Sequence, residues 1–146
     1  MTTRSSFLRR HKKAVLGALV IAWILALLAT HLPGRDLPPG LLNLGDTVLH
    51  SVGFFCLASL FWLTLAAYNV RLAHRVTTVL CAMMIYAAVD ETTQAWVNRS
   101  PEVADWLADV TGVLLAVTIL EVGRRLVFGP QHRVQAPPNP YQQHPF

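Results

Sequence analysis

The chain has 146 residues, of which 53% are hydrophobic and 14% are charged, whereas typical soluble domains carry about 25% charged residues. This composition argues against a soluble domain and favours a membrane protein. The net charge is +4, and such a basic balance can indicate nucleic-acid binding. Here the Lys and Arg residues lie in short segments beside apolar runs, which is the pattern of membrane topology. We therefore expect a lipid bilayer as the environment and no nucleic-acid partner.

The first apolar run follows a basic segment. Residues 1–13 contain five Lys or Arg residues and no acid, and residues 14–32 form an uncharged run of 19 residues. A cleaved signal peptide is the alternative, because a basic start and an apolar run are its first two parts. This run is longer than a usual signal core, and no clear Ala-x-Ala site follows it. The sequence therefore predicts a basic leader and an uncleaved first span.

Three more apolar runs predict membrane spans at residues 47–68, 76–97 and 105–128, because about 18 or more apolar residues suffice to cross a bilayer. Residues 129–146 contain five prolines and no apolar period, a composition typical of a disordered tail. The predicted fold class is all-α: a four-helix transmembrane bundle with short loops, over residues 14–128, between the basic leader and the tail.

The charges predict the orientation of the four spans. Four spans return the C-terminus to the side of the N-terminus, and that side then holds ten of the twelve Lys and Arg residues. The positive-inside rule places both termini in the cytoplasm. Acids show the opposite bias, which topology alone does not require. Seven of the eight lie toward the outer side: Asp36, Asp46, Asp90, Glu91, Glu102, Asp105 and Asp109.

Two adjacent carboxylates, Asp90 and Glu91, lie inside the third apolar run. A carboxylate at the centre of a bilayer costs on the order of 3 kcal/mol or more, and such residues are usually functional. Gln94 lies within one helical turn of both, and the commoner role of such a residue is a hydrogen bond between helices. We expect a functional role for Asp90 and Glu91. Arg99, in the following loop, is favoured as their counter-ion over an interfacial anchor.

Two further polar pairs have i, i+4 spacing, and each stands at the outer end of a span: Asp46 with His50, and Asp105 with Asp109. With a rise of about 1.5 Å per residue, these pairs and the two adjacent carboxylates lie at depths compatible with one pocket open to the outside. Simple structural roles remain as alternatives. Asp46 and Asp105 can cap helices, His50 can join helices by a hydrogen bond, and Gly112 is better explained by close helix packing.

The five acids of this predicted pocket carry a formal charge of −5, against which the sequence offers only Arg99. Such an excess in a low dielectric requires protonated acids, a cationic His50, or a bound cation. A divalent metal or a cationic ligand is therefore one hypothesis, since hard cations favour several oxygen ligands. No compact metal motif such as His-Glu-x-x-His is present, so a bound divalent cation stays one alternative among these.

Taken together, these blocks resemble the VanZ-like family of bacterial integral membrane proteins. The blocks are Asp46-x-x-x-His50-x-x-x-Phe54, Asp90-Glu91-x-x-Gln94, Arg99, and Asp105-x-x-x-Asp109-x-x-Gly112. The resemblance extends over roughly residues 15–128. The family often has Lys where this chain has Thr47, and Asn where it has Asp109, so this site is more acidic. The resemblance implies a multi-pass protein of the bacterial inner membrane. The namesake of the family is linked to low-level resistance to the glycopeptide teicoplanin.

The leading functional hypothesis is the binding or modification of a lipid-linked or cell-wall molecule at the outer leaflet. In an enzymatic version His50 and Glu91 act as acid and base, and Arg99 holds an anionic group. Asp90 completes the candidate catalytic set. No nucleophile motif supports this version, so enzymatic activity stays open. The other candidate pocket residues are Asp46, Gln94, Asp105, Asp109 and Gly112.

Two functions of other classes remain. The first is a non-catalytic membrane scaffold whose polar residues only join helices. The second is an ion or proton pathway. The inner halves of the second and third spans contain no acid, which argues against a through-membrane relay in a monomer. The sequence predicts no oligomeric state.

Overall fold

The computed structural model describes residues 3–31, 45–97 and 100–128. Over these ranges the chain forms five α-helices and one short 3-10 helix, with no strand. The elements are α1 (Thr3–Arg10), α2 (Lys12–His31), α4 (Asp46–Ala67), α5 (Leu72–Gln94), the 3-10 helix η2 (Ala95–Val97) and α6 (Val103–Phe128). The predicted all-α fold is confirmed.

Four of these helices, α2, α4, α5 and α6, are long and apolar enough to cross a membrane. The shortest, α2, has 20 residues, which at about 1.5 Å per residue corresponds to about 30 Å, the thickness of the hydrocarbon layer. Large apolar side chains are exposed along them, among them Ile24, Ile85 and Ile119. Water penalises such a surface and lipid does not. The described helices therefore suit a bilayer environment.

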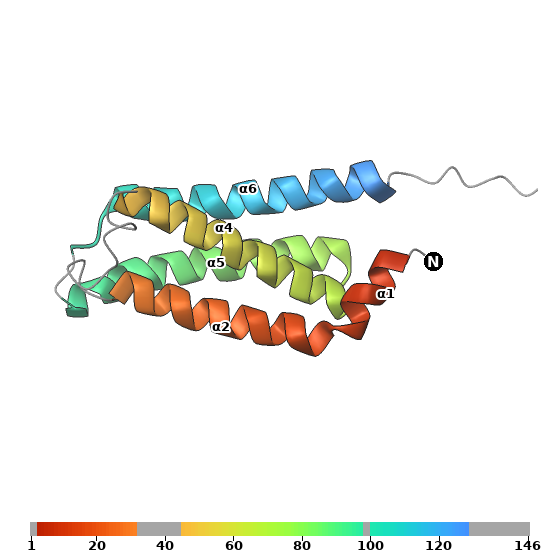
Figure 1. The fold of residues 1–146 in the computed structure, drawn as a ribbon. Coiled ribbons are helices and arrows are strands. Elements are labelled where there is room, and N and C mark those ends of the chain that lie inside the picture. The colour runs from red at the N-terminus through yellow and green to blue at the C-terminus, as the bar shows by residue number, and fades with distance from the viewer. Residues whose placement is uncertain (1–2, 32–44, 98–99, 129–146) are drawn as a thin grey trace, which may run out of the picture.

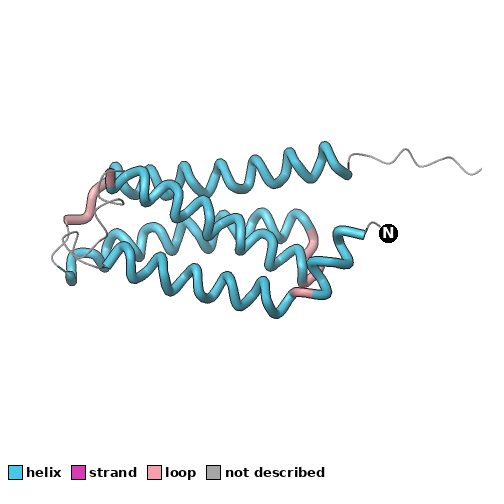
Figure 2. Tube along the Cα trace, in the orientation of Figure 1, coloured by secondary structure: helices cyan, strands magenta, loops and turns pink. Residues whose placement is uncertain are grey.

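The four long helices lie side by side along a common direction (Figure 1), and α1 is set at an angle to α2. We call the end where α2 and α5 finish and α4 and α6 begin the polar end, and the opposite end the terminal end. The helices α4 and α6 therefore run parallel to each other. Figure 2 shows two of the described connections as short loops, one between α4 and α5 at the terminal end and one leading into α6 at the polar end.

The turn between α4 and α5 is a Schellman motif. The N–H of Val70 donates to the Leu65 carbonyl (3.0 Å), and the N–H of Asn69 donates to the Ala66 carbonyl (3.1 Å), so carbonyls at the end of α4 find donors. Asn69 has φ = 58°. Asn tolerates this left-handed backbone better than most residues, which lets α5 reverse direction within a few residues.

The packing core lies between α4, α5 and α6. It begins next to the polar end and extends toward the terminal end. Its members are all apolar: Phe54, Leu57, Ala58, Trp62, Val79, Met83, Ala87, Val113, Ala116 and Val117. The most extensive helix contact is between α4 and α6. At that contact a Cβ added to Gly112 would collide with the carbonyl oxygen of Ser51 and approach the backbone nitrogen of Phe55 to 3.0 Å. Gly112 is thus a close-packing point, the role that its sequence context favoured.

The largest difference between the described helices and the expected spans is at the start of α5. The helix α5 begins at Leu72, four residues before the predicted start, because polar residues continue the helix there. Arg75 donates to the Val70 carbonyl (2.8 Å) and lies over the Trp62 ring at 4.5 Å, which keeps its charge accommodated within the first turn. The helix α1 lies within the basic leader, where no helix was predicted. The predicted disordered tail, 129–146, lies outside the described residues.

Replacing Gly112 with Ala should destabilise the protein, because the new methyl group meets backbone atoms of α4 that cannot rotate away. Overpacking of this kind costs about 1–3 kcal/mol, so we expect a lower midpoint in a thermal unfolding experiment in detergent. Gly123→Ala is the matched control on the same helix, since a Cβ there meets nothing within 4 Å. It should be neutral or stabilising by up to about 1 kcal/mol. Equal stability of the two variants would contradict the close packing at Gly112.

Candidate functional site

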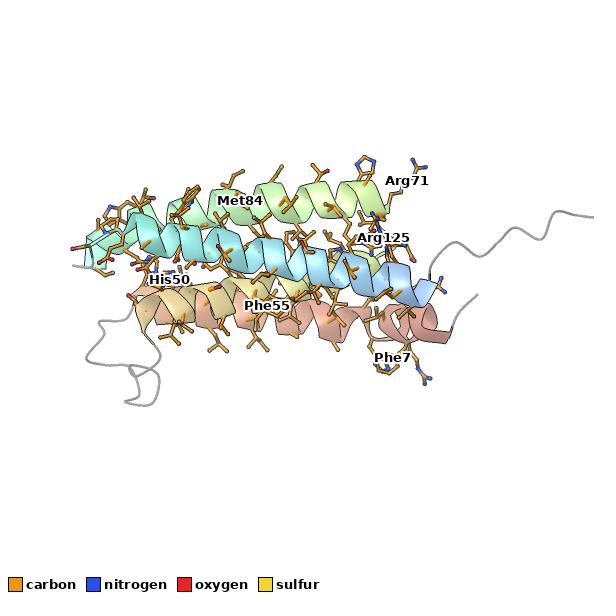
Figure 3. The ribbon with its side chains drawn as sticks, turned by 90° about the horizontal axis from the view of Figure 1, so that it is seen from above. Phe7, His50, Phe55, Arg71, Met84 and Arg125 are labelled. Carbon is orange, nitrogen blue, oxygen red and sulfur yellow. The ribbon has the colours of Figure 1, made fainter. Side chains whose placement is uncertain are left out.

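Six buried polar side chains gather at the polar end of the bundle. Each is exposed by 6% or less of its surface: His50, Asp90, Glu91, Gln94, Asp105 and Asp109. Among the described residues these include every buried ionisable side chain. Figure 3 shows His50 at this end, and Arg71 and Arg125 at the opposite end. The predicted convergence of polar groups from three spans is therefore present in the structure.

His50 is hydrogen-bonded to Asp109 at the centre of this cluster. The Nδ1 atom of His50 on α4 lies 3.0 Å from Oδ1 of Asp109 on α6, so an N–H at Nδ1 donates to the carboxylate. Glu91 on α5 lies further away, with Oε1 3.8 Å from the same nitrogen. One ligand atom from each of these three residues lies within 4.8 Å of the others. The carboxylate directly bonded to His50 is thus Asp109, and Glu91, the predicted acid–base partner of His50 in the enzymatic version, lies further from the ring.

Two further carboxylates, those of Asp46 and Asp105, lie near His50 toward the start of α4. One ligand atom each from Asp46, His50 and Asp105 lies within 4.8 Å of the others, and the Thr47 hydroxyl donates to Oδ1 of Asp105 at 2.9 Å. Neither acid is an N-cap. Gly45 is the N-cap of α4, with no side-chain cap bond, and Asp105 lies inside the first turn of α6. Both acids stand in first turns, where the helix dipole favours negative charge.

The α5 carboxylates are held by protein donors. Gln94 donates to Oε1 of Glu91 (3.3 Å) and, at 3.5 Å, to Oδ2 of Asp90. The other oxygen of Glu91 accepts the backbone N–H of Glu102 at 3.0 Å. Glu91 therefore ties α5 to the segment that leads into α6. Arg99, the predicted counter-ion of these acids, lies outside the described residues.

Sequence reasoning missed a contribution from α2. The Thr30 hydroxyl donates to Oδ1 of Asp90 at 2.9 Å. His31 shares a hydrogen bond with the Thr93 hydroxyl (Nε2 to Oγ1, 2.9 Å), and its Nδ1 lies 3.8 Å from Asp90. The available signal was a Thr-His pair that ends an otherwise apolar run, together with Thr93 one turn after Asp90. The polar cluster thus has members on all four long helices.

Aromatic rings line the side of the cluster that faces the apolar core. Tyr86, one turn before Asp90, stacks on Phe54, one turn after His50, with ring centroids 5.4 Å apart. Trp23 of α2 meets Tyr86 edge-on at 5.3 Å. Beyond these rings, toward the terminal end, lies the apolar core already described. Among the described residues, the buried ionisable side chains therefore all lie on the polar-end side of this aromatic layer.

Two buried atoms of the central pair have no hydrogen-bond partner within the described part of the chain: Nε2 of His50 and Oδ2 of Asp109. Buried polar atoms in folded proteins are nearly always paired, so each exception requires an explanation.

A groove of about 640 Å³ lies elsewhere, at the terminal end between α5 and α6, and is lined mainly by apolar residues such as Val76 and Val117. The predicted pocket open to the outer side stays a prediction, and of the acids in the two groups around His50 Asp46 is exposed.

The four apolar helices and the buried polar cluster at one end define the chain as a multi-pass membrane protein. The comparison with known families agrees with this class. A family model described as VanZ/LLP1 matches residues 29–124, more than half of the chain. The protein therefore belongs to the VanZ/LLP1 family, as its polar blocks suggested. No curated protein and no solved structure matches it significantly.

Replacing Glu91 with Ala should destabilise the fold, because the Glu102 N–H and the Gln94 amide both lose an acceptor. A buried donor left unsatisfied costs about 1–3 kcal/mol, which thermal unfolding in detergent can detect. Glu102→Ala is the matched control, since Glu102 contributes only its backbone N–H to this bond and its side chain is exposed. A Glu91→Ala protein that melts at or above wild type would mean that the carboxylate is retained at a cost to stability, as functional groups often are.

Proposed function

We propose that this VanZ-like protein binds or modifies an envelope component at the outer leaflet of a bacterial cell membrane, and that the polar cluster around His50 and Asp109 is its site. Such a component is a lipid-linked or cell-wall molecule, because the cluster lies at one end of the long helices rather than midway along the bundle. The only exposed acid of the two groups around His50 is Asp46, which marks the side from which a ligand reaches the cluster.

The observation that carries the proposal is the incomplete pairing of His50 and Asp109. Polar residues that only join helices satisfy one another, because in lipid no water is available to do so. Here Nε2 of His50 and Oδ2 of Asp109 are buried without a partner among the described residues. Desolvation of such atoms is costly unless a ligand completes them. This pattern favours a binding or reactive site over a purely structural cluster.

An enzymatic version assigns the proton-transfer role to His50. A carboxylate that accepts the Nδ1 proton fixes the ring orientation and leaves Nε2 to act as a base or acid toward a ligand. Asp109, at 3.0 Å, fits this orienting role better than Glu91 at 3.8 Å. Binding without reaction requires the same geometry, so we leave the choice between binding and catalysis to experiment.

A scaffold role is the second candidate, and the hydrogen bonds of α5 favour it. Both oxygens of Glu91 accept protein donors, Gln94 bridges the two α5 carboxylates, and Asp90 is also bonded to Thr30 of α2. These residues act as connectors between α2, α5 and the start of α6. Within one cluster, then, the α5 side has the properties of a scaffold and the α4–α6 side those of a site.

An ion pathway receives no comparable support. A continuous relay requires ionisable side chains or water along the whole span. Between the aromatic layer and the terminal end, the buried residues that α5 and α6 contribute to the core are all apolar: Val79, Met83, Val113, Ala116 and Val117. These side chains separate the cluster from the charged residues of the terminal end.

The orientation is part of the proposal, since an outer-leaflet ligand requires the polar end to face outward. Single cysteines can test this in a Cys56→Ser, Cys81→Ser background. Glu102→Cys at the polar end should react with a membrane-impermeant thiol reagent on intact cells, whereas Arg71→Cys at the terminal end should react only after permeabilisation. Both parent side chains are exposed. The reverse labelling pattern would place the cluster on the cytoplasmic side and exclude an outer-leaflet ligand.

Ligand retention can test the binding role directly. Wild type and His50→Gln protein, purified from the same bacterial membranes, should differ in co-purifying envelope molecules when compared by native mass spectrometry. We expect at least one lipid-linked or cell-wall species to be enriched with wild type, lost with His50→Gln and Asp109→Asn, and retained with Gly123→Ala. Identical co-purifying molecules for all four proteins would favour the scaffold role.

Teicoplanin susceptibility provides a second readout, chosen because the family's namesake is linked to resistance to this drug. If this chain acts on the same class of envelope molecule, expressing wild type should raise the inhibitory concentration at least fourfold, and expressing His50→Gln should not. A ligand that co-purifies without any change in susceptibility would keep the binding role and remove the link to glycopeptides.

A further inference from the structure

His50 lies between two groups of carboxylates, and one ring nitrogen is left over. Asp109 and Glu91 are on one side, with Asp109 bonded to Nδ1. Asp46 and Asp105 form the second group. The imidazole is 97% buried, and its Nε2 has no hydrogen-bond partner among the described residues. Since Nδ1 is engaged, Nε2 is the atom that remains for a ligand.

Helix geometry places the His50 side chain near Asp46 and Asp105. The Cα–Cβ bonds of a helix tilt toward its N-terminus, so a side chain covers the turn before its own Cα. For His50 the preceding turn contains Asp46, and the adjacent first turn of the parallel α6 contains Asp105. Because Nδ1 is bonded to Asp109, Nε2 is the ring nitrogen available to this second group.

We infer that Asp46, His50 and Asp105 bind a divalent metal cation, with Nε2 of His50 and one carboxylate oxygen from each acid as ligands. One ring nitrogen of His50 and one carboxylate oxygen from each acid lie within 4.8 Å of one another. Ligands about 2.1 Å from a shared ion stand at most about 4.2 Å apart, so small side-chain rotations close the site. The exposed Asp46 gives the ion a path from the polar end.

Two hydrogen bonds hold the proposed ligands in place. A metal-binding His commonly donates its second ring N–H to a carboxylate, which fixes the tautomer and the ring orientation. Asp109 provides this carboxylate at 3.0 Å, and it is therefore a positioning residue. The Thr47 hydroxyl plays a similar part for Asp105 at 2.9 Å. The site thus has the supporting contacts that a cluster of acids alone would lack.

The ligand set indicates the class of metal. Imidazole nitrogen suits Zn²⁺ and other transition metals, whereas Mg²⁺ and Ca²⁺ prefer oxygen ligands only. One imidazole and two carboxylates therefore favour Zn²⁺ or Mn²⁺ over the alkaline-earth ions. A divalent cation would also offset negative charge of the Asp46 and Asp105 carboxylates.

The other group of three, His50, Glu91 and Asp109, is the competing position. A metal there would have to take Nδ1 from its hydrogen bond to Asp109. It would also compete for Glu91, whose two oxygens already accept Gln94 and Glu102 donors. It would leave the Nε2 atom of His50 unexplained. These three points favour the group that contains Asp46 and Asp105.

The full chain, purified in detergent and freed of metal by chelator, should bind Zn²⁺ in isothermal titration calorimetry with one equivalent per chain. Mg²⁺ should bind at least tenfold more weakly. His50→Gln and Asp105→Asn should each weaken Zn²⁺ binding at least tenfold, and Asp109→Asn should weaken it by about 10- to 100-fold as the loss of an orienting partner does. Glu91→Gln should bind as wild type does. Helix content and a monodisperse elution profile show which variants are folded.

Cobalt substitution gives a second readout. A variant that only loses stability would not change the absorption spectrum of bound Co²⁺. The visible absorption of bound Co²⁺ should appear with wild type, disappear with His50→Gln and shift with Asp109→Asn. Wild type without saturable Zn²⁺ binding would overturn the inference. So would binding that His50→Gln leaves unchanged, or binding that Glu91→Gln removes while Asp46→Asn does not. No envelope ligand is present in these experiments, so they test the cation site separately from envelope binding. A cation on Nε2 would exclude the enzymatic version in which that atom transfers the proton.

Discussion

The close parallel approach of α4 and α6 is the constraint on which the polar end depends. At Gly112 the backbones come too near for a Cβ, against Ser51 and Phe55. Gly112 lies one turn after Asp109, and Ser51 follows His50 directly, so this approach fixes the level at which the two helices face each other. At that level His50 meets Asp109, and one turn earlier Thr47 meets Asp105. A larger residue at 112 would shift the register of both pairs.

The bundle separates two kinds of interaction along its length. Toward the terminal end, apolar side chains fill the core. Other apolar side chains lie on the outer surface of the helices, where lipid accommodates them. Toward the polar end, carboxylates and a histidine are buried at a free-energy cost that their hydrogen bonds must offset. The aromatic layer of Trp23, Phe54 and Tyr86 separates the two regions.

Much of the fold followed from the sequence, because apolar runs of span length have few alternatives in a membrane protein. The i, i+4 pairs placed His50 and Asp109 on faces that could meet. The spacing of residues could not predict which carboxylate bonds to His50. Whether His50 bonds to Asp109 or Glu91 depends on the rotation and register of whole helices, which periodicity does not define. The contribution of Thr30 and His31 depended on where α2 ends relative to α5, and this too is a tertiary property.

The cluster divides by helix into groups that are satisfied and groups that are not. On α5, Glu91 and Gln94 use their polar atoms on protein partners, and their removal exposes unpaired donors. On α4 and α6, His50 and Asp109 each keep one buried atom without a described partner. A fold under selection for stability alone would remove such atoms, because apolar replacements of similar shape are often neutral or stabilising. In the His50–Asp109 pair, the atoms without a described partner therefore lie on α4 and α6, whereas Glu91 and Gln94 of α5 form connecting hydrogen bonds.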